Sequence, residues 1–489
     1  MRQFFRSGIL GVSMGIATAL LPVSSVGQSI GSDKNTLPDI GVVASEVLTL
    51  DKEMLVGDAI MRQMRGQAPV IDDPVLTEYI QDLGNRLVLQ AENTKFPFEF
   101  FIINNSVMNA FAFYGGHVGV HSGIITRADT ESEVASVLAH EVTHVTQRHL
   151  ARRALSQQRS SPLQIASMLG SILLAMANPE AGIAAMQTST AVANQLNIDY
   201  TRSNEQEADR IGIDILYQAG FDPKAASTFF GKMAEEYRTS SRPPERLLTH
   251  PLTEKRIADA RNRMRRYPDV RLRPSLSFNL AKARLLARYQ FEPDYALEHF
   301  KAVVENDTFA IRDAGLYGLA IAYLANEENL KAKQINDQLL ARTPGNLFYV
   351  DLATDIALAM GNADEAIAML QKELEHKPRN SVVVLNLANA YMANDNHDAA
   401  IELIRDYLLV HPHDQLAYQL LSNAYKAQKS YKGMHQSKAE LLALYGAYPN
   451  AIDELQHAYN YTGDDHLEKQ RIRARIQQFR DEQEKLKQF

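Results

Sequence analysis

The sequence predicts a mostly α-helical protein in which a helical domain with a small β-sheet precedes an α-solenoid. Apolar residues keep a helical period from Glu131 to Leu150, and two short stretches rich in aromatic and β-branched residues lie just before them. Beyond about residue 273 the chain reads as almost entirely helical, with a 34-residue spacing. The chain has no cysteine, which excludes disulfides, zinc–thiolate sites and thiol nucleophiles.

The first 27 residues have the order of a secretory signal peptide. They contain, in sequence, the basic residues Arg2 and Arg6, the apolar run Ile9–Leu21 and the small residues Ser25–Gly27. Their removal would take the formal charge from −7 to −9, which argues mildly against nucleic acid or anionic lipid as the main partner. We expect a signal peptide over 1–27, a linker over 28–50 and two domains, over 51–272 and 273–489.

The expected helix at 131–150 carries the pentad His140-Glu141-Val142-Thr143-His144, with Asp129 and Thr130 as plausible N-caps. Histidines four residues apart lie on one helical face, so both imidazoles can reach a single ion. Glu141 points beside such an ion, where a base takes a proton from metal-bound water. The pentad favours a zinc hydrolase over the alternative, an accidental pair of packed histidines.

A catalytic zinc needs a third protein ligand and one open position. One known continuation of the pentad is excluded, because Gln147 and Leu150 stand where a glycine and a histidine would be needed. His149 is one residue out of register with that continuation, and we expect it to be a solvated histidine at the helix end.

The other known solution is a glutamate from a second helix, which Asn204 to Asp209 would open. Glu205 and Asp209 share a face, so Glu205 can bind the metal while Asp209 accepts the free N–H of a ligand histidine. Glu207 is expected to point to a different face. The alternative is that acidic residues simply favour a helix start.

His-Glu-x-x-His followed by Glu-x-x-Ala-Asp resembles the gluzincin metallopeptidase family, which includes the CAAX-prenyl protease and the HtpX membrane peptidase. Similarity spans nearly the whole mature chain and is strongest from about residue 95 to 265. The matching stretches are Ile103–Asn105, Asn109–Phe113 with Gly115-Gly116, Thr146–Arg152, Asn204–Gly212 and Leu248–Pro251. The resemblance implies a gluzincin-type zinc metallopeptidase domain with one Zn²⁺ per chain. The implied ligands are His140, His144 and Glu205, with Glu141 as the general base.

These stretches closely resemble a periplasmic member of that family, so the resemblance implies a periplasmic endopeptidase in outer-membrane protein quality control. Its implied substrates are misassembled outer-membrane β-barrel proteins, and its implied partner is the machinery that assembles them. The alternative is mainly a repeat scaffold or chaperone with a latent protease site. A hydrolase of murein lacks support, because nothing in the sequence looks like a carbohydrate groove with stacked aromatics and there is no tryptophan.

Two residues beyond the pentad are further candidates. His250 precedes Pro251 in a proline-rich loop, which by itself indicates a turn. The resemblance instead implies that His250 occupies the open position of the metal and keeps the enzyme latent. Arg256 either faces the developing oxyanion or forms a surface ion pair.

Strands are expected over 98–103 and 110–122, and Asn109 to Tyr114 is the best candidate for an edge that pairs with an extended substrate. An ordinary small sheet is the alternative. His117 and His121 are expected on the strand surface.

The apolar segment Leu163–Ala177 is too short for a membrane span and predicts a buried helix or a helix that faces a membrane or client. Residues 178–200 suit a mobile cover over the cleft.

The C-terminal half shows tetratricopeptide-repeat positions, with three to four repeats between about 311 and 430 and degenerate signals at 281–308 and 434–470. The repeated positions are Ala332, Ala366 and Ala400, then Pro344, Pro378 and Pro412, and the tyrosines Tyr323, Tyr391 and Tyr425. Asn386 and Asn389 either line the concave groove or are ordinary polar helix positions. His466 to Phe489 is expected to form a capping helix.

Overall fold

The computed structural model describes residues 49–160, 202–239, 250 and 254–487. The expected signal peptide, the segment Leu163–Ala177 and the expected cover at 178–200 lie outside these residues. Among the described helices, none is both long and apolar enough to cross a membrane.

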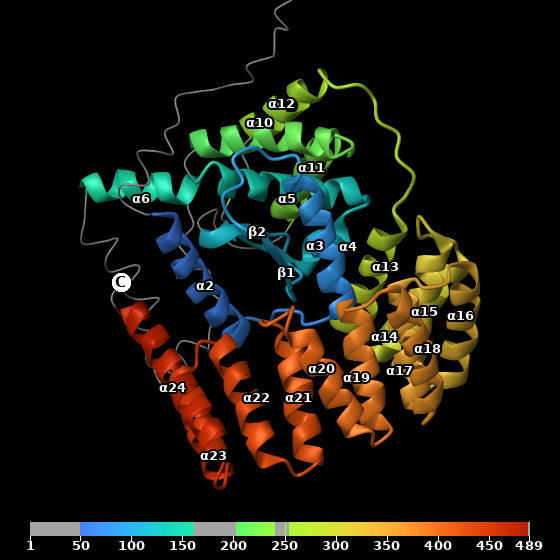
Figure 1. The fold of residues 1–489 in the computed structure, drawn as a ribbon. Coiled ribbons are helices and arrows are strands. Elements are labelled where there is room, and N and C mark those ends of the chain that lie inside the picture. The colour runs from blue at the N-terminus through green and yellow to red at the C-terminus, as the bar shows by residue number, and fades with distance from the viewer. Residues whose placement is uncertain (1–48, 161–201, 240–249, 251–253, 488–489) are drawn as a thin grey trace, which may run out of the picture. The chain divides into compact units, whose positions relative to one another are not determined.

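The N-terminal part is a helical layer around a three-stranded sheet (Figure 1). Its elements are α2 (Leu50–Gln67), α3 (Pro74–Val88), β1 (Glu99–Ile103), β2 (Ala110–Phe113), a 3-10 turn (Tyr114–Gly116), β3 (His117–His121), α4 (Ser122–Arg127), α5 (Glu131–Thr146), α6 (His149–Ser160), α10 (Arg202–Gln218), α11 (Ala225–Thr239) and α12 (Glu254–Met264).

The strand order is β1-β3-β2, with β1 parallel and β2 antiparallel to β3. The expectation of one strand over 110–122 was wrong, because a turn separates β2 from β3. Gly115 and Gly116 adopt φ values of 80° and 90° in that turn, a left-handed region that glycine occupies without steric cost. Among the described strands, β2 therefore lies at an edge of the sheet, as expected for the stretch Asn109 to Tyr114. The pairing of this edge with an extended substrate stays a prediction.

Helix α5 packs its apolar face on the sheet and contacts α10 on its other side. Thr130 caps its first turn by accepting a hydrogen bond from the backbone N–H of Glu133 at 3.3 Å. Gly212 allows the close approach of α10, because a Cβ there would lie 3.1 Å from the backbone nitrogen of His140. The pentad is therefore held between the sheet and a second helix.

The single helix expected from 131 to 150 breaks after Thr146. Arg148 has a φ of 50°, which is uncommon for a residue with a Cβ. Its guanidinium forms a buried ion pair with Glu53 of α2, with Nε 2.8 Å from Oε1. This distant partner stabilises the break, after which α6 begins at His149.

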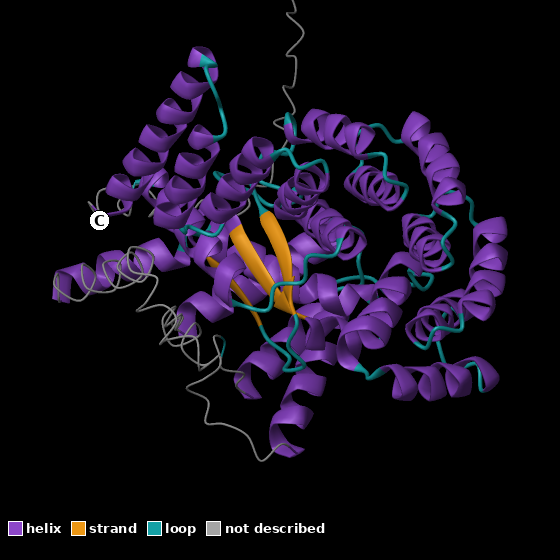
Figure 2. Ribbon diagram, turned by 90° about the horizontal axis from the view of Figure 1, so that it is seen from below, coloured by secondary structure: helices purple, strands orange, loops and turns teal. Residues whose placement is uncertain are grey.

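The C-terminal part is a succession of antiparallel helices, which follow one another along an arc beside the sheet in Figure 2. They are α13 (Leu276–Leu285) with a π-helical turn (Leu286–Gln290), α14 (Pro293–Glu305), α15 (Arg312–Ala325), α16 (Asn329–Arg342), α17 (Leu347–Ala359), α18 (Ala363–His376), α19 (Ser381–Ala393), α20 (His397–Leu408), α21 (Gln415–Ala427), α22 (Tyr431–Leu444), α23 (Tyr448–Asn460) and α24 (His466–Lys487).

The repeat pattern matches this arrangement. Ala332, Ala366 and Ala400 are buried where paired helices meet, and the three repeated prolines stand in the turns between pairs. Asn386 does not line an open groove, because it is buried and donates to Asp351 Oδ1 at 3.0 Å, whereas Asn389 is exposed. The groove interpretation of Asn386 was therefore wrong.

The solenoid contacts the N-terminal part at both of its ends and in its middle, where α17 and α19 pack against α3. Helix α13 packs against α3 and α4, and Asn380 at the start of α19 donates to Glu78 of α3 at 2.8 Å. Toward the C-terminus, Ala443 accepts a hydrogen bond of 2.6 Å from Arg62 of α2. Ala59 of α2 also belongs to the apolar cluster formed by α22, α23 and α24.

Candidate metal centre

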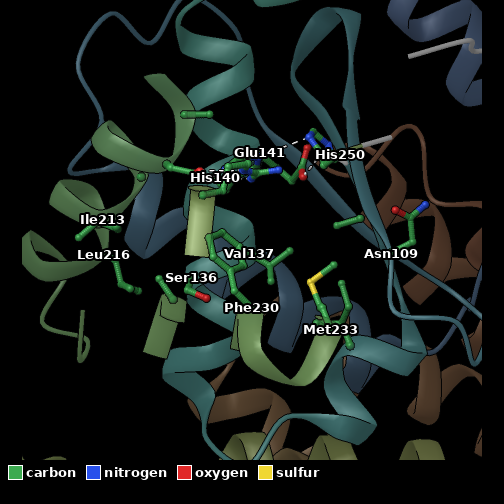
Figure 3. Close-up of a pocket in the computed structure, with 17 residues that line it drawn as sticks. Asn109, Ser136, Val137, His140, Glu141, Ile213, Leu216, Phe230, Met233 and His250 are labelled. Atoms are coloured by element: carbon green, nitrogen blue, oxygen red, sulfur yellow. Dashed lines mark hydrogen bonds and ion pairs between the residues drawn. The ribbon is translucent and has the colours of Figure 1, made fainter. Parts of the chain in front are cut away.

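Two helices and one residue outside them bring the candidate side chains together. Helix α5 supplies His140, Glu141 and His144, helix α10 supplies Glu205, and His250 enters from the chain before α12. Figure 3 shows the ring of His250 beside Glu141, across from His140. One ligand atom from each of His140, His144, Glu205 and His250 lies within 4.8 Å of the other three.

The spacing of these atoms fits a small tetrahedral cation. The two Nε2 atoms of His140 and His144 lie 3.0 Å apart, and Glu205 Oε1 is 3.4 Å from His144 Nε2. His250 Nδ1 is 3.4 Å from His140 Nε2 and 2.8 Å from Glu205 Oε1. Ligands at zinc–nitrogen distances of about 2.0 Å in a tetrahedron stand about 3.3 Å apart, so the donor set suits that ion in kind and in spacing.

Asp209 lies one turn after Glu205 and faces the far side of the first imidazole. Its Oδ1 is 3.0 Å from His140 Nδ1, the position from which a carboxylate orients a metal-binding histidine. This is the placement expected from the shared face of Glu205 and Asp209.

Arg256 of α12 holds two acidic residues of α10, Glu205 and Asp209. Its Nη1 is 2.6 Å from Glu205 Oε2, and its Nε and Nη2 each lie 2.8 Å from an oxygen of Asp209. The guanidinium is buried, so the interpretation as a surface ion pair was wrong. Since two carboxylates take up its donors, Arg256 in this conformation supports the acidic side chains and does not face an oxyanion.

His250 lies between the donor set and Glu141. While its Nδ1 faces Glu205, its Nε2 is 3.2 Å from Glu141 Oε1. The imidazole therefore fills the space from which a water molecule would have to meet both Glu141 and the donor set.

The electrostatics of the cluster favour positive charge at its centre. Burial alone would lower the pKa of His250, but the charges of Glu141 and Glu205 outweigh it and raise that pKa to about 10. The pKa of His140 is likewise raised against burial, by Asp209 and Glu205. Burial and the neighbouring charges of His140 and His250 lower the pKa of His144.

Comparison with known proteins places this site in a family. A model described as Peptidase family M48 matches residues 74–264, and a tetratricopeptide-repeat model matches residues 357–424. The beta-barrel assembly-enhancing protease of Escherichia coli (strain K12) is 43% identical over 476 residues, which cover 96% of each chain. The protein of that name from Yersinia pestis is 42% identical over 470 residues, 96% of this chain and 97% of its own. The chain belongs to peptidase family M48.

This M48 peptidase is accordingly a metalloprotease with a repeat domain behind its catalytic domain. Metalloprotease LoiP of Escherichia coli is 27% identical over 268 residues, 52% of this chain but 95% of its own length. Nearly the whole of that relative therefore matches about half of this chain.

One residue that supports the cluster was misread from the sequence of the peptidase, and the partner of a second was not foreseen. His149 is not a solvated helix end: it is fully buried, and its Nδ1 lies 2.9 Å from Nδ1 of His144. Glu207 does face another side of α10, but there its Oε2 meets His149 Nε2 at 3.0 Å. The break after Thr146 carries His149 back toward the pentad, and no local pattern signals that break.

Two further histidines of the M48 domain lie outside the cluster. His117 was expected on the strand surface but is buried, with Nε2 3.3 Å from Asp58 Oδ1 and Nδ1 3.1 Å from Glu99 Oε2. His121 is half-buried, and burial lowers its pKa to about 4.

An apolar cavity adjoins the pentad, and Glu141 and His250 are among the residues that line it. It is lined by the middle of α5, the second half of α10 and residues of α11 (Figure 3). Its apolar lining includes Val137, Ile213, Leu216, Phe230 and Met233. A peptide bond held at Glu141 would have this cavity available for a neighbouring apolar side chain.

Proposed function

We propose that this chain is a zinc-dependent endopeptidase of the periplasm that acts on outer-membrane β-barrel proteins during their assembly. The observation that carries the chemistry is the convergence of His140, His144 and Glu205 on one point, with Glu141 beside it. The names of the relatives that match nearly the whole chain support the substrate class and the setting. In this proposal residues 1–27 are a signal peptide, 28–50 a linker, 51–272 the peptidase domain and 273–489 the repeat domain.

We assign one zinc ion to His140, His144 and Glu205, because nitrogen and carboxylate donors at this spacing suit it. When bound, zinc supplies Lewis acidity that polarises a peptide carbonyl and lowers the pKa of a water molecule. Asp209 holds the tautomer of His140 through Nδ1, and Arg256 fixes the carboxylates of Glu205 and Asp209.

Glu141 is the general base in this mechanism. It takes a proton from the attacking water and delivers it to the nitrogen of the leaving amine. In the described conformation His250 Nε2 faces the oxygen of Glu141 that would do this, at 3.2 Å. His250 must therefore leave before water and substrate can enter, and so it gates the site.

The second candidate function is a repeat scaffold or chaperone with a latent protease site. The position of His250 favours latency, since its ring stands in the donor set and against Glu141 at once. The solenoid offers a separate surface for client capture, which raises the effective concentration of a bound chain near the centre.

The deciding experiment compares the wild type with Glu141→Gln, His250→Ala and, as a matched control, Glu305→Gln, an exposed glutamate on α14. Zinc content is measured by elemental analysis, and proteolysis by cleavage of casein and of the chain itself. Glu141→Gln keeps zinc and loses at least a hundredfold in cleavage rate, the usual contribution of a general base being roughly 10²–10⁴. His250→Ala raises basal self-cleavage, and Glu305→Gln behaves as the wild type.

Cleavage that survives Glu141→Gln would refute the role of Glu141. If Glu141→Gln instead loses all cleavage but still restores envelope integrity in a deletion strain, the scaffold function gains support.

A further inference from the structure

The two imidazoles of the pentad are supported in different ways. His140 Nδ1 meets the carboxylate of Asp209 directly, at 3.0 Å. His144 Nδ1 instead meets a second imidazole, that of His149, at 2.9 Å. The second imidazole in turn meets Glu207 Oε2 at 3.0 Å, and Arg152 Nη1 donates to the same oxygen at 3.0 Å.

The protons of this chain can be assigned from its chemistry. Nε2 of His144 faces the donor set, so its proton is on Nδ1 when Nε2 binds a metal. Nδ1 of His149 must then accept, which places the proton of that ring on Nε2, opposite the carboxylate of Glu207. Each nitrogen has a donor or acceptor role that agrees with its neighbour.

The backbone is bent to allow this contact. In a continuous helix a residue five positions after His144 would point away from it, because the helical period is 3.6 residues. The left-handed conformation of Arg148, stabilised by its buried pair with Glu53, brings His149 back against His144. A strained backbone that serves a buried polar contact indicates a functional constraint.

We propose that His149, Glu207 and Arg152 form a positioning relay that holds His144 in its metal-binding tautomer and couples metal binding to the junction of α6 and α10. This inference rests on the proposed function, in that His144 binds zinc through Nε2. The relay joins α5 to α6 through His149 and Arg152, and to α10 through Glu207. By thermodynamic linkage, anything that displaces α6 from α10 weakens metal binding, and metal binding opposes that displacement by the same free energy.

A merely structural role for His149 makes a different prediction. A buried histidine that only fills space contributes equally to the stability of the metal-free and metal-loaded proteins. A positioning residue contributes mainly to the metal-loaded protein, since the orientation of His144 matters only when Nε2 has a metal to bind. A structural and a positioning role of His149 can therefore be distinguished by two measurements. These are the metal affinity and the difference in stability between the metal-free and the metal-loaded protein.

The test uses the full mature chain carrying Glu141→Gln, which prevents self-cleavage, with His149→Ala, His149→Asn or Glu207→Gln added. His121→Asn is the matched control, a partly buried histidine of the same domain outside the relay. Zinc affinity is measured by competition with a chromogenic chelator. Thermal unfolding is measured with and without zinc, and hydrogen exchange is measured over residues 147–155.

We expect His149→Ala to weaken zinc binding roughly 10- to 100-fold, the usual effect of removing such a partner. His149→Asn keeps an acceptor near the position of Nδ1, so its zinc affinity falls less than that of His149→Ala. Glu207→Gln keeps a weaker acceptor opposite His149, so its zinc affinity also falls less than that of His149→Ala. Zinc slows hydrogen exchange at 147–155 in the parent protein, and this effect shrinks in His149→Ala. His121→Asn leaves zinc affinity unchanged.

Wild-type zinc affinity in His149→Ala and Glu207→Gln would overturn the relay while leaving the proposed zinc site intact. Equal losses of stability with and without zinc would assign His149 a structural role and also overturn it. If His149→Ala fails to fold, His149→Asn and Glu207→Gln decide the question by the same measurements. A parent protein that binds no zinc would instead refute the proposed function, and the relay with it.

Discussion

Two clusters of buried charge among the described residues differ in one respect. The candidate metal centre holds three carboxylates, Glu141, Glu205 and Asp209, with Arg256 as its cationic side chain. The other cluster joins the solenoid to the N-terminal part around Arg284, which is among the largest fully buried side chains of the described residues.

The cluster around Arg284 supplies its own counter-charges. Arg284 lies 2.6 Å from Asp73, the N-cap of α3, and 2.6 Å from Asp351 of α17. Arg288 pairs with Asp355 in the same region, and Tyr289 donates to Asp73 at 2.8 Å. Two guanidinium groups thus face three carboxylates, and their hydrogen bonds compensate the cost of burial.

In the metal centre, by contrast, imidazole nitrogens and carboxylate oxygens face one another. Two ring nitrogens 3.0 Å apart, as in His140 and His144, are stable together only with a proton or a cation between them. Burial of charge is therefore shared by both clusters, whereas the convergence of lone pairs is particular to the centre. That convergence, more than burial or charge number, distinguishes a site from a structural network.

The largest effect is expected from removing the central cation of the structural cluster. Arg284→Met leaves Asp73 and Asp351 buried without their main partner, which costs about 3–5 kcal/mol of unfolding free energy. Urea unfolding followed by circular dichroism measures the loss. Arg342→Met, which breaks a partly exposed pair with Asp313 on the same solenoid, is the control and costs about 1 kcal/mol or less. Equal losses in the two variants would mean that the cluster is no more than a surface pair.

Removing the metal is expected to have the next largest effect. A zinc concentration one hundredfold above Kd stabilises the folded state by about 3 kcal/mol, so a chelator lowers the thermal midpoint of the wild type. Glu205→Gln loses a charged ligand and reduces this shift, while Arg284→Met retains the shift in full although its midpoint is lower. A midpoint that does not move with chelator in the wild type contradicts a metal-binding centre.

Much of the candidate metal centre could be predicted from the spacing of residues along single helices. The i,i+4 relation of His140 and His144, and of Glu205 and Asp209, depends only on helix geometry, and each pair does share a face. The repeated alanines were equally informative, because each marks a close contact between neighbouring helices.

What the sequence did not reveal depends on partners far along the chain. The turn at Arg148 depends on Glu53, 95 residues earlier, and without it His149 is placed on the wrong side of a longer helix. Arg284 pairs with Asp73, 211 residues away, and neither residue stands in a motif. The prediction of one strand over 110–122 was wrong for a local reason. Gly115 and Gly116 form a turn there, although the strand pattern on either side of these two glycines favours a single strand.

The smallest effect is expected at His117 of the peptidase domain. Like Arg284, His117 is buried and lies between two carboxylates, those of Asp58 and Glu99. Burial alone would lower the pKa of His117, but its hydrogen bonds to Asp58 and Glu99 outweigh burial and raise it. A pKa raised on folding gives stability that is fully present below about pH 6.5, the unfolded value, and is lost as pH rises through the folded value. His117→Gln should therefore cost about 1 kcal/mol at pH 6 and progressively less toward pH 9.

Thermal midpoints of the wild type and His117→Gln across this range test the sign of that dependence. His121→Gln is the matched control, because burial lowers the pKa of His121 to about 4 and reverses the sign. Its contribution to stability changes between about pH 4 and pH 6.5, rising with pH, and is constant above that range. A His117 contribution that stays constant from pH 6 to pH 9 would mean that Asp58 and Glu99 do not share a proton with this ring. His117 would then resemble the cluster around Arg284 in the arrangement of its side chains but not in their charges.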